Sequence, residues 1–412
     1  MPNQIDPDEK NNFRIDVDVA VRLIADHMPT YPSESVDLES ARGAILRQQV
    51  IAERDQPPFD RVTMDGIAIR SAALAGGTRS FHVNGIQGAG VTELPLGGEG
   101  NCVEIMTGAL LPEDADTVVP VERLERNGDD VTLEPGYQPN PGQFVHRRGS
   151  DLKAGQPLLE PGSLIGAPEM AVLTIAGSAT VSVARWPKIA AVSTGDELVD
   201  VGNPIKLFQI RSSNDRAIVA ALEKRGCTTA TRTWLPDDPD ALRRSISEMH
   251  ERDDILVLSG GVSMGKYDYV QQIMDELGMR LIFHKILQKP GLPMWFGVSA
   301  QGKPVFALPG NPVSSLVCLI RFVLPAIRTA MGASLPERQT VRLAESVHFE
   351  PNLTCFLPVG LKVNADGDLR AIPRPTNTSG DFVSLARTDG FVELCRGRDD
   401  FDAGEPVSFY QW

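Results

Sequence analysis

Hydrophobic and polar positions alternate with two different periods between residues 188 and 331. Short apolar runs have the length of buried strands, and the segments between them repeat apolar residues every three or four positions, as one face of a helix does. The apolar runs are KIAAVST (188–194), DILVLS (254–259), RLIFHKIL (280–287) and PVFAL (304–308). The helical segments are 217–222, 242–249, 270–277 and 312–320, the last with an N-cap at Asn311 and Pro312 at its first position. This alternation predicts a doubly wound α/β domain with a mostly parallel sheet.

The pattern changes on both sides of this domain, which we place at residues 185–335. Residues 54–151 are rich in Gly and Pro with short β-like runs, which predicts a β-rich inserted domain. Residues 14–53 and 152–184 carry helical patterns, including apolar positions 38–45, and predict a mixed linker domain that the insertion interrupts. Residues 336–412 contain short, regularly spaced strands, which predict a small C-terminal β-barrel or sandwich.

Composition and charge indicate a globular protein and narrow its ligands. The chain has 412 residues, 42% hydrophobic and 23% charged, with a net charge of −14. This charge repels nucleic acid and anionic membranes, so an anionic ligand needs a locally basic pocket. Apolar runs such as LVCLI (316–320) end at a charge, Arg321, short of the roughly 20 residues that cross a bilayer. The polar N-terminus resembles no targeting segment, so we expect no membrane partner and a cytoplasmic protein.

The five cysteines carry no sign of metal or disulfide chemistry. They are far apart in the sequence and odd in number, which fits neither a CxxC metal site nor a complete disulfide framework. We therefore expect buried free thiols at Cys102, Cys227, Cys318, Cys355 and Cys395.

Three glycine-containing turns follow three of the predicted strands. They are STGDE (193–197), SGGVSMGKYD (259–268) and LPGNPVS (308–314). In a doubly wound sheet such turns meet beyond the carboxyl ends of the strands, where phosphates bind. We therefore expect all three at one edge of the sheet, around an anionic ligand.

The second turn has two interpretations. Gly260, Gly265 and Lys266 fit the P-loop spacing G-x-x-x-x-G-K, but Tyr267 follows where a P-loop needs a Ser or Thr hydroxyl for magnesium. A nucleotide triphosphatase is therefore the weaker interpretation. The alternative is an anion cradle in which Asp268 replaces the hydroxyl as metal ligand or general base. The cradle residues would be Gly260, Gly261, Ser263 and Gly265.

Acidic residues near other turns also have two explanations each. Asp196 and Glu197 either hold Mg²⁺ beside a phosphate or act as acidic residues at a helix start. Asp237 and Asp238 of WLPDDPDALRR (234–244) raise the same alternatives. Asp65 of MDG either forms a simple turn with Gly66 or takes part in the chemistry.

Hydroxyl and basic residues complete the candidate chemistry. Thr107 of EIMTGALLP (104–112) either receives a phosphate or lies in a hairpin turn. Arg147 and Arg148 lie beside Asp151 and suit an anionic ligand, although surface ion pairs explain them equally well. Two further cations, Lys285 and Lys289, lie in HKILQKPGLP (284–293), where solvent-facing lysines are the simpler explanation for either one alone.

The order of these stretches is more specific than any one of them. PxFDxxxMDGxA, MTGAxLP, RRGxD, STGDEL, SGGVSxGxxDY, KPGxP and LPGNPVS follow one another between residues 57 and 314. In this order they resemble the MoeA family of molybdenum insertases, which includes the E domain of gephyrin. The resemblance covers nearly the whole chain, about residues 14–412.

The resemblance implies an activity and an assembly. Members of the family insert molybdate into adenylylated molybdopterin and release AMP in a Mg²⁺-dependent step. It implies an elongated homodimer of four-domain subunits, with a MogA-like third domain and an active cleft between that domain and the β-rich domain of the partner subunit. Further implied partners are a MogA-type adenylyltransferase and molybdoenzyme apoproteins.

The resemblance also assigns roles to residues at matching positions. Catalytic roles fall on Asp65, Asp151, Glu197, Asp237, Asp268, Lys285 and Lys289. Cofactor-binding roles fall on Thr107, Ser193, Thr194, Gly195, Gly260, Gly261, Ser263, Pro309, Gly310 and Pro312. Lysines and loop amides would neutralise pyrophosphate and molybdate, while Glu197 and Asp268 would hold Mg²⁺.

Three positions depart from the family pattern. Ile67 replaces an aromatic residue in MDGYA, Lys266 is basic, and Leu292 stands in KPGLP where KPGKP has a lysine. Loss of that lysine favours an alternative, a weakened paralogue that keeps the fold and dimer but serves as a molybdopterin carrier or protein scaffold. The retained carboxylates favour the enzyme.

Overall fold

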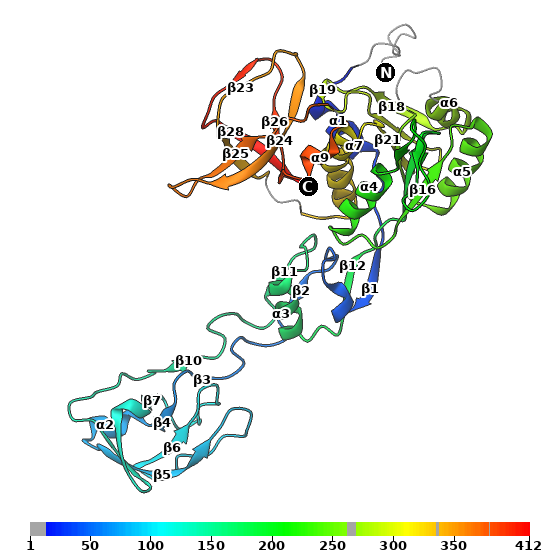
Figure 1. Cartoon of the computed structure of the whole chain (residues 1–412). Helices are drawn as coiled ribbons and strands as arrows, with labels where there is room; N and C mark the ends of the chain where they lie inside the picture. Colours follow the sequence, from blue (N-terminus) through cyan, green and yellow to red (C-terminus); the bar gives the residue numbers. More distant parts are fainter. Residues whose placement is uncertain (1–13, 262–268, 335–337, 379) are drawn as a thin grey trace, which may run out of the picture. The chain divides into compact units, whose positions relative to one another are not determined.

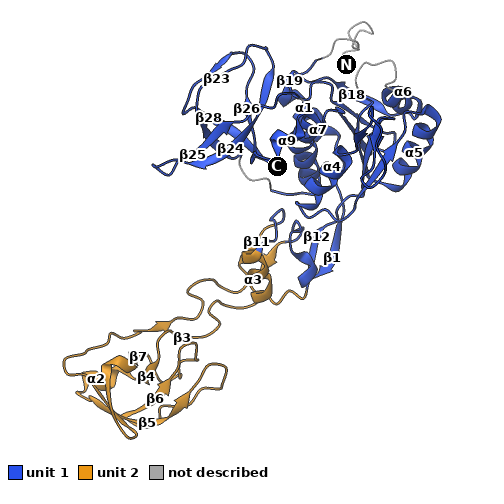
Figure 2. Cartoon of the chain, in the orientation of Figure 1, with its two compact units in different colours: residues 1–48, 161–166, 180–412 blue, residues 49–160, 167–179 orange. Residues whose placement is uncertain are grey.

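The computed structural model describes residues 14–261, 269–334, 338–378 and 380–412 (Figure 1). The chain divides into two compact units (Figure 2), unit 1 with residues 1–48, 161–166 and 180–412, and unit 2 with residues 49–160 and 167–179. Unit 1 contains an α/β sheet structure and a β-barrel, and unit 2 is mostly β. The division into two units does not test the boundaries of the four domains proposed from the sequence, and these boundaries stay a prediction.

A six-stranded sheet forms the centre of unit 1 and confirms the doubly wound, mostly parallel prediction. Its strands, in spatial order, are β16 (Ala230–Leu235), β13 (Ile189–Thr194), β17 (Ile255–Ser259), β21 (Pro304–Leu308), β20 (Trp295–Val298) and β18 (Arg280–His284). The first four are parallel, and β20 and β18 are antiparallel to their neighbours. The register places Ser193 beside Ser259 and Ser259 beside Leu308, so three strands end at one edge.

Two strands of this sheet were missed, and one was predicted too long. The edge strand β16 reads ATRTWL and leaves most of its side chains partly or fully exposed, so it has no apolar run. In β20 the run WFGV is broken by Gly297, where a Cβ would lie 2.3 Å from the Trp295 ring. The strand predicted at 280–287 ends at His284, because Lys285 has φ +74.

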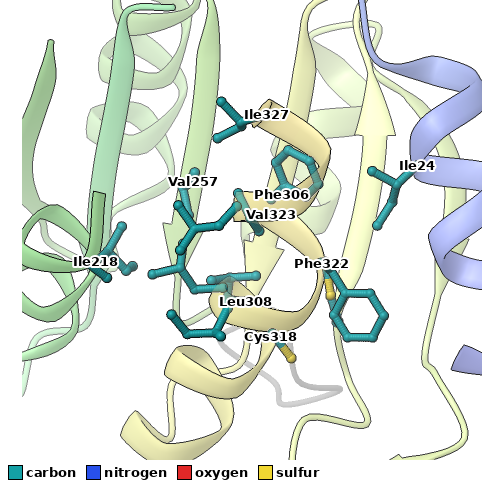
Figure 3. Close-up of a cluster of buried hydrophobic side chains, with 14 of the residues drawn as sticks. Ile24, Ile218, Val257, Phe306, Leu308, Cys318, Phe322, Val323 and Ile327 are labelled. Carbon is teal, nitrogen blue, oxygen red and sulfur yellow. The ribbon is translucent and has the colours of Figure 1, made fainter. Parts of the chain in front are cut away.

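Helices cover both faces of the sheet because side chains alternate along its buried strands. Val257 and Phe306 pack against one helical layer (Figure 3), and Leu258 and Ala307 pack against the other. The first layer consists of α1 (Val17–His27), α4 (Asn214–Glu223), α7 (Pro312–Cys318), the π-helix η4 (Leu319–Val323) and α8 (Leu324–Ala330). The second consists of α5 (Pro239–Arg252) and α6 (Tyr269–Glu276).

The helical stretch Pro312–Ala330 runs through α7, η4 and α8 without a break. The helix therefore continues past Arg321, the charge at which the apolar run LVCLI ends in the sequence. Within the described ranges it is the one helix that could cross a membrane by length and composition, but 67% of its apolar window is buried, as in the core helix of a folded domain. Arg321 is buried too, and its Nε lies 3.0 Å from Glu393 Oε2.

The C-terminal region of unit 1 forms a closed five-stranded barrel, as predicted. The barrel strands are β22 (Thr340–Leu343), β24 (Thr354–Val363), β25 (Leu369–Pro373), β26 (Gly390–Leu394) and β28 (Pro406–Gln411). The order β24-β25-β22-β28-β26 closes by a β24–β26 pairing, and β19 (Gln288–Lys289) adds to β24. The short elements nearby are β23 (Val347–His348), β27 (Asp400–Phe401) and α9 (Phe382–Leu385).

Unit 2 is built around a second six-stranded sheet, which agrees with the predicted β-rich insertion. Its strands, in spatial order, are β7 (Thr117–Pro120), β4 (Gly66–Ile69), β6 (Asn101–Ile105), β5 (Ser80–Gln87), β9 (Asp130–Leu133) and β8 (Leu124–Asn127). The other elements are β2 (Val50–Ile51), β3 (Arg61–Val62), α2 (Ser71–Ala75), η3 (Val121–Arg123), β10 (Val145–His146), β11 (Pro157–Leu159) and α3 (Ala167–Ile175). Here β3 pairs with β10, and β2 with β11.

Two local predictions need correction. The helical pattern at 38–45 forms only the 3-10 turn η2 (Leu38–Ala41), which follows β1 (Ser33–Asp37); that strand pairs with β12 (Thr180–Ala184). Four of the five cysteines are buried free thiols as expected, but Cys395 is exposed because it follows the last residue of β26. Burial raises the pKa of the Cys318 thiol to about 12.

Candidate functional site

The described residues of the three glycine-containing turns, of which the second is described only as far as Gly261, meet at the carboxyl ends of β13, β17 and β21. They line a cavity of about 560 Å³ in unit 1, which we call the turn pocket. Of the predicted site residues, it brings together Ser193, Thr194, Gly195, Glu197, Asp237, Gly260, Gly261, Pro309, Gly310 and Pro312. Its wall also contains residues that sequence reasoning did not select: Arg211, Ser213, Asn214, Ser259 and Asn311.

Backbone conformation favours glycine at two positions of the turns, and close approach of a second turn adds to this at Gly260. Gly260 has φ +102, and a Cβ there would lie 2.7 Å from Thr194 O and 2.8 Å from Thr194 Oγ1. At Gly195, with φ +148, a Cβ would lie 2.6 Å from Glu197 Oε2. The N–H groups of both glycines already donate, to Leu308 O and Leu235 O, so they are not free for a ligand. The backbone of these turns therefore forms the pocket wall, and Glu197 folds against it.

A side chain at the start of α4 connects the other two turns. Asn214 Nδ2 donates to Ser259 Oγ at 2.7 Å and to Gly310 O at 2.8 Å. Because the Gly310 carbonyl can only accept a hydrogen bond, its contact with Nδ2 fixes the orientation of the Asn214 side-chain amide. Asn214 was missed because in the sequence it looks like an ordinary polar residue at a helix start.

The hydroxyl of Thr194 is the clearest sign of a ligand in the turn pocket. Thr194 is 5% exposed, and its Oγ1 has no hydrogen-bond partner within the part of the chain that the structure describes. Buried polar atoms are almost always hydrogen-bonded. The Thr194 hydroxyl therefore calls for a partner beyond the described residues, and a phosphate oxygen is a suitable acceptor.

Two carboxylates, Glu197 and Asp237, line the turn pocket. Asp196 Oδ1 accepts from the backbone N of Asp237 at 3.1 Å and so connects the first turn to the turn before α5. Asp238 is the N-cap of α5 and accepts from Ala241 N at 2.7 Å, which confirms the capping explanation for that residue.

Part of the glycine-rich loop lies outside the described residues, which exclude 262–268. Ser263, Lys266 and Asp268 therefore stay predictions from the sequence. Within the described ranges, no group of three or more His, Cys, Asp or Glu side chains could hold a metal. Glu197 and Asp237 both line the turn pocket, and carboxylates are suitable ligands for Mg²⁺ when ligand phosphates and water complete its coordination.

Neither predicted lysine lines the turn pocket. Lys289 lines a neighbouring cavity of about 760 Å³, the barrel cavity, beside the KPGLP turn and the β-barrel. The two cavities share Pro293 and Asn311. Lys289 Nζ lies 6.0 Å from the centre of the Phe349 ring. Lys285 lines neither of these two cavities.

In unit 2, Asp65 and Thr107 form a local hydrogen-bonded pair. Asp65 Oδ1 accepts from Thr107 N at 2.6 Å and from Thr107 Oγ1 at 2.7 Å. These two bonds, the backbone bond first, hold the pKa of Asp65 below its usual range. The pair keeps this exposed carboxylate ionised and fixed in orientation.

The arginines of RRGSD pair with other carboxylates than expected. Asp151 Oδ1 is hydrogen-bonded to His146 Nε2 at 2.8 Å, a partner that sequence reasoning missed. Arg147 pairs with Asp60, and Arg148 with Asp55. Both arginine side chains are exposed, which supports the alternative of surface ion pairs for the two arginines.

Comparison with sequence families covers nearly the whole chain. The MoeA N-terminal region (domain I and II) matches residues 15–177. A probable molybdopterin binding domain matches residues 190–329, which include β13, β17 and β21. The MoeA C-terminal region (domain IV) matches residues 340–412.

Individual relatives and solved structures agree with these matches. The chain is 37% identical over 399 residues to a molybdopterin molybdenumtransferase of Synechocystis, covering 97% of this chain and 100% of the relative. It is 32% identical over 405 residues to one of Staphylococcus aureus, covering 97% and 96%. A crystal structure of a molybdopterin biosynthesis MoeA protein from Pyrococcus horikosii matches with TM-score 0.79 and 32% identity, covering 97% and 99%. Another, from Pyrococcus horikoshii OT3, matches with TM-score 0.80 at 24% identity and supports the fold alone.

Proposed function

The chain belongs to the MoeA family, and from this premise we propose that it acts in molybdenum cofactor biosynthesis as a molybdopterin molybdenumtransferase. In detail, it inserts molybdate into adenylylated molybdopterin and releases AMP in a Mg²⁺-dependent step. The observation that carries this proposal is the turn pocket, where three strand ends, two carboxylates and a buried hydroxyl without a partner among the described residues come together. We propose that the pyrophosphate of the substrate binds there.

Each residue of the turn pocket would have a role that follows from its chemistry. The Thr194 hydroxyl, which finds no partner among the described residues, donates to a phosphate oxygen. Glu197 and Asp237 would hold Mg²⁺, joined by Asp268 of the glycine-rich loop. The metal, when bound, neutralises charge on the phosphates as AMP leaves. Asn214 keeps the turns of β17 and β21 in register while the ligand binds.

The barrel cavity is the proposed entry for molybdate. Lys289 supplies a positive charge beside the carboxylate of Glu345, and Asn311 and Pro293 line both this cavity and the turn pocket. Leu292 also lines this cavity, so the missing lysine lies where an oxyanion would bind. Coulomb attraction to a dianion is weaker with one cation than with two. We therefore propose weak molybdate binding rather than none.

The remaining assignments rest on the family resemblance. We propose that Asp65, Thr107 and Asp151 act in catalysis or substrate binding, that Lys285 assists, and that the protein is a cytoplasmic homodimer. Suppliers and acceptors of the pterin would be a MogA-type adenylyltransferase and molybdoenzyme apoproteins. Size-exclusion chromatography with light scattering tests the dimer, and a monomer that still turns over would contradict it.

The decisive experiment measures AMP release from adenylylated molybdopterin with Mg²⁺ and a series of molybdate concentrations. We expect molybdate-stimulated AMP release that Glu197→Gln lowers and that more Mg²⁺ partly restores. The matched control is Glu223→Gln, an exposed carboxylate on α4 outside the turn pocket, which should behave as wild type. The absence of molybdate-stimulated release by the wild type would contradict the enzyme proposal.

A second candidate function is a molybdopterin carrier or scaffold, which Leu292 in the barrel cavity favours. The same experiment separates the two. A carrier binds adenylylated molybdopterin tightly but shows no turnover at any molybdate concentration. If Leu292→Lys lowered the molybdate concentration needed for turnover, the enzyme would be the correct assignment, with a weakened oxyanion site.

A further inference from the structure

A third cavity lies on the other side of the first turn. It has a volume of about 620 Å³ and we call it the tryptophan pocket. Asp196 lines this pocket, Glu197 lines the turn pocket, and Leu198 lines both. The other residues of its wall are Val199, Asp200, Asn203, Gln209, Arg232, Thr233 and Trp234. The two pockets therefore adjoin at Leu198.

Trp234 gives this pocket a fixed aromatic wall. The residue is 43% exposed although it lies in β16, beside Ser193 in the parallel register. Its indole Nε1 donates to Gly195 O at 2.9 Å, the carbonyl of the turn that separates the two pockets. A hydrogen-bonded indole has already lost its rotational freedom, so a ring that stacks on it gains contact without that entropic cost.

The charged groups of the tryptophan pocket largely neutralise one another. Arg232 pairs with the fully buried Asp215 at 2.9 Å and with Asp200 at 3.1 Å. Asp200 also pairs with Arg216 at 2.7 Å. Asp196 already accepts a backbone hydrogen bond through Oδ1. Because Arg232 is engaged by two carboxylates, the pocket offers little net positive charge and suits an uncharged group rather than a second phosphate.

The shape and chemistry of this wall suit a flat, amino-bearing ring. Leu198, Val199 and the indole contribute apolar surface, while the Asp196 carboxylate and the Gln209 and Asn203 amides provide hydrogen-bonding groups at the rim. Carboxylates and amides accept from ring N–H and amino groups. We propose that the tryptophan pocket binds a planar nitrogen heterocycle of the substrate, stacked on Trp234, while the attached phosphates occupy the turn pocket.

This inference rests on the proposed function, because adenylylated molybdopterin carries two such rings, adenine and pterin, joined through phosphates. Both rings share the chemistry that the pocket recognises. Binding experiments with two probes, AMP and 6-hydroxymethylpterin, distinguish them. The ring that belongs in the pocket is the one whose affinity depends on Trp234.

The test compares wild type with Trp234→Leu and Trp234→Phe as full-length proteins, by calorimetric titration with each probe. Loss of one base-on-aromatic stack weakens binding roughly 5- to 150-fold, so we expect Trp234→Leu to raise the Kd of one probe by this factor. Trp234→Phe keeps a ring but loses the bond to Gly195 O, and should stay within about 5-fold of wild type. Quenching of the wild-type tryptophan fluorescence by the same probe should disappear in both variants.

Two outcomes overturn the inference. One is unchanged affinity of Trp234→Leu for both probes. The other is equal weakening in Trp234→Leu and Trp234→Phe, which would mean that the indole only holds the Gly195 turn in place. A fold check by circular dichroism and the melting temperature accompanies each variant. Failure of molybdate turnover in the wild type would contradict the proposed function and leave the ring-binding result standing.

Discussion

Replacing Gly260 by alanine tests whether close contact between two turns builds the turn pocket. With φ +102 this residue lies in a region that L side chains rarely adopt, and its Cβ would lie 2.7 Å from Thr194 O. The second neighbour, Thr194 Oγ1, would be 2.8 Å away. Since one of the two atoms belongs to the backbone of β13, a turn must move to accept the methyl group.

Two costs contribute to the expected destabilisation. A non-glycine residue in this backbone region costs about 1–3 kcal/mol. Overpacking a close contact costs about another 1–3 kcal/mol. Gly397→Ala is a matched control for the first cost, because Gly397 has φ +100 and its Cβ would meet nothing within 4 Å. The difference between the two variants, about 1–3 kcal/mol, therefore measures the contact with Thr194.

The assay combines thermal unfolding with AMP titration. For a domain of this size 1 kcal/mol corresponds to roughly 2–4 °C in Tm, so Gly260→Ala should melt several degrees below Gly397→Ala. It should also bind AMP more weakly, because the displaced turn carries the Thr194 hydroxyl. Equal melting temperatures for the two variants, with wild-type AMP affinity, would refute the proposed construction of the pocket.

Two further predictions concern the partners of carboxylates. Arg321→Met leaves the buried Glu393 carboxylate without its cation and should lower the free energy of unfolding, measured by urea titration, by about 3–5 kcal/mol. The control is Arg243→Met, which breaks an exposed ion pair and should lower that free energy by at most about 1 kcal/mol. Similar losses would contradict the burial argument. Thr107→Val removes a hydrogen bond that lowers the pKa of Asp65, so that pKa should rise in NMR titrations. The stability that this bond contributes is present at pH values above the pKa of Asp65 in the unfolded chain, and it is lost as the pH falls through the lower pKa of the folded protein. The stabilities of the variant and the wild type should therefore converge in acid. An unchanged Asp65 pKa in the variant would contradict this reasoning.

Much of the fold could be predicted because its signals are local. The runs that became β13, β17 and β21 are mostly apolar and buried at every position because helices cover both faces, and short apolar runs bounded by turn residues indicate such strands. Asn311 and Pro312 mark the start of α7 through side-chain chemistry that acts within one turn. The three turns were expected at one edge because parallel strands impose it, and they lie there.

Other features depended on neighbours that the sequence does not reveal. β16 is an exposed edge strand held by its pairing with β13, and Lys285 leaves the extended conformation after a run that looks like a continuous strand. Asp65 and Asp151 could be selected from the sequence as candidates, but their hydrogen-bond partners Thr107 and His146 are defined by contacts in the folded unit. Their proposed roles stay predictions.

The sequence by itself determined the family, the α/β sheet and the set of turns, since each depends on residue type, spacing or order along the chain. Only the tertiary structure decided which groups share a cavity. Asn214 meets Ser259 across 45 positions and Gly310 across 96, and Trp234 reaches back to Gly195 across 39. The physical reason is that side-chain hydrogen bonds and stacking act over a few ångströms in space, and spacing along the chain carries no record of which distant residues will come that close.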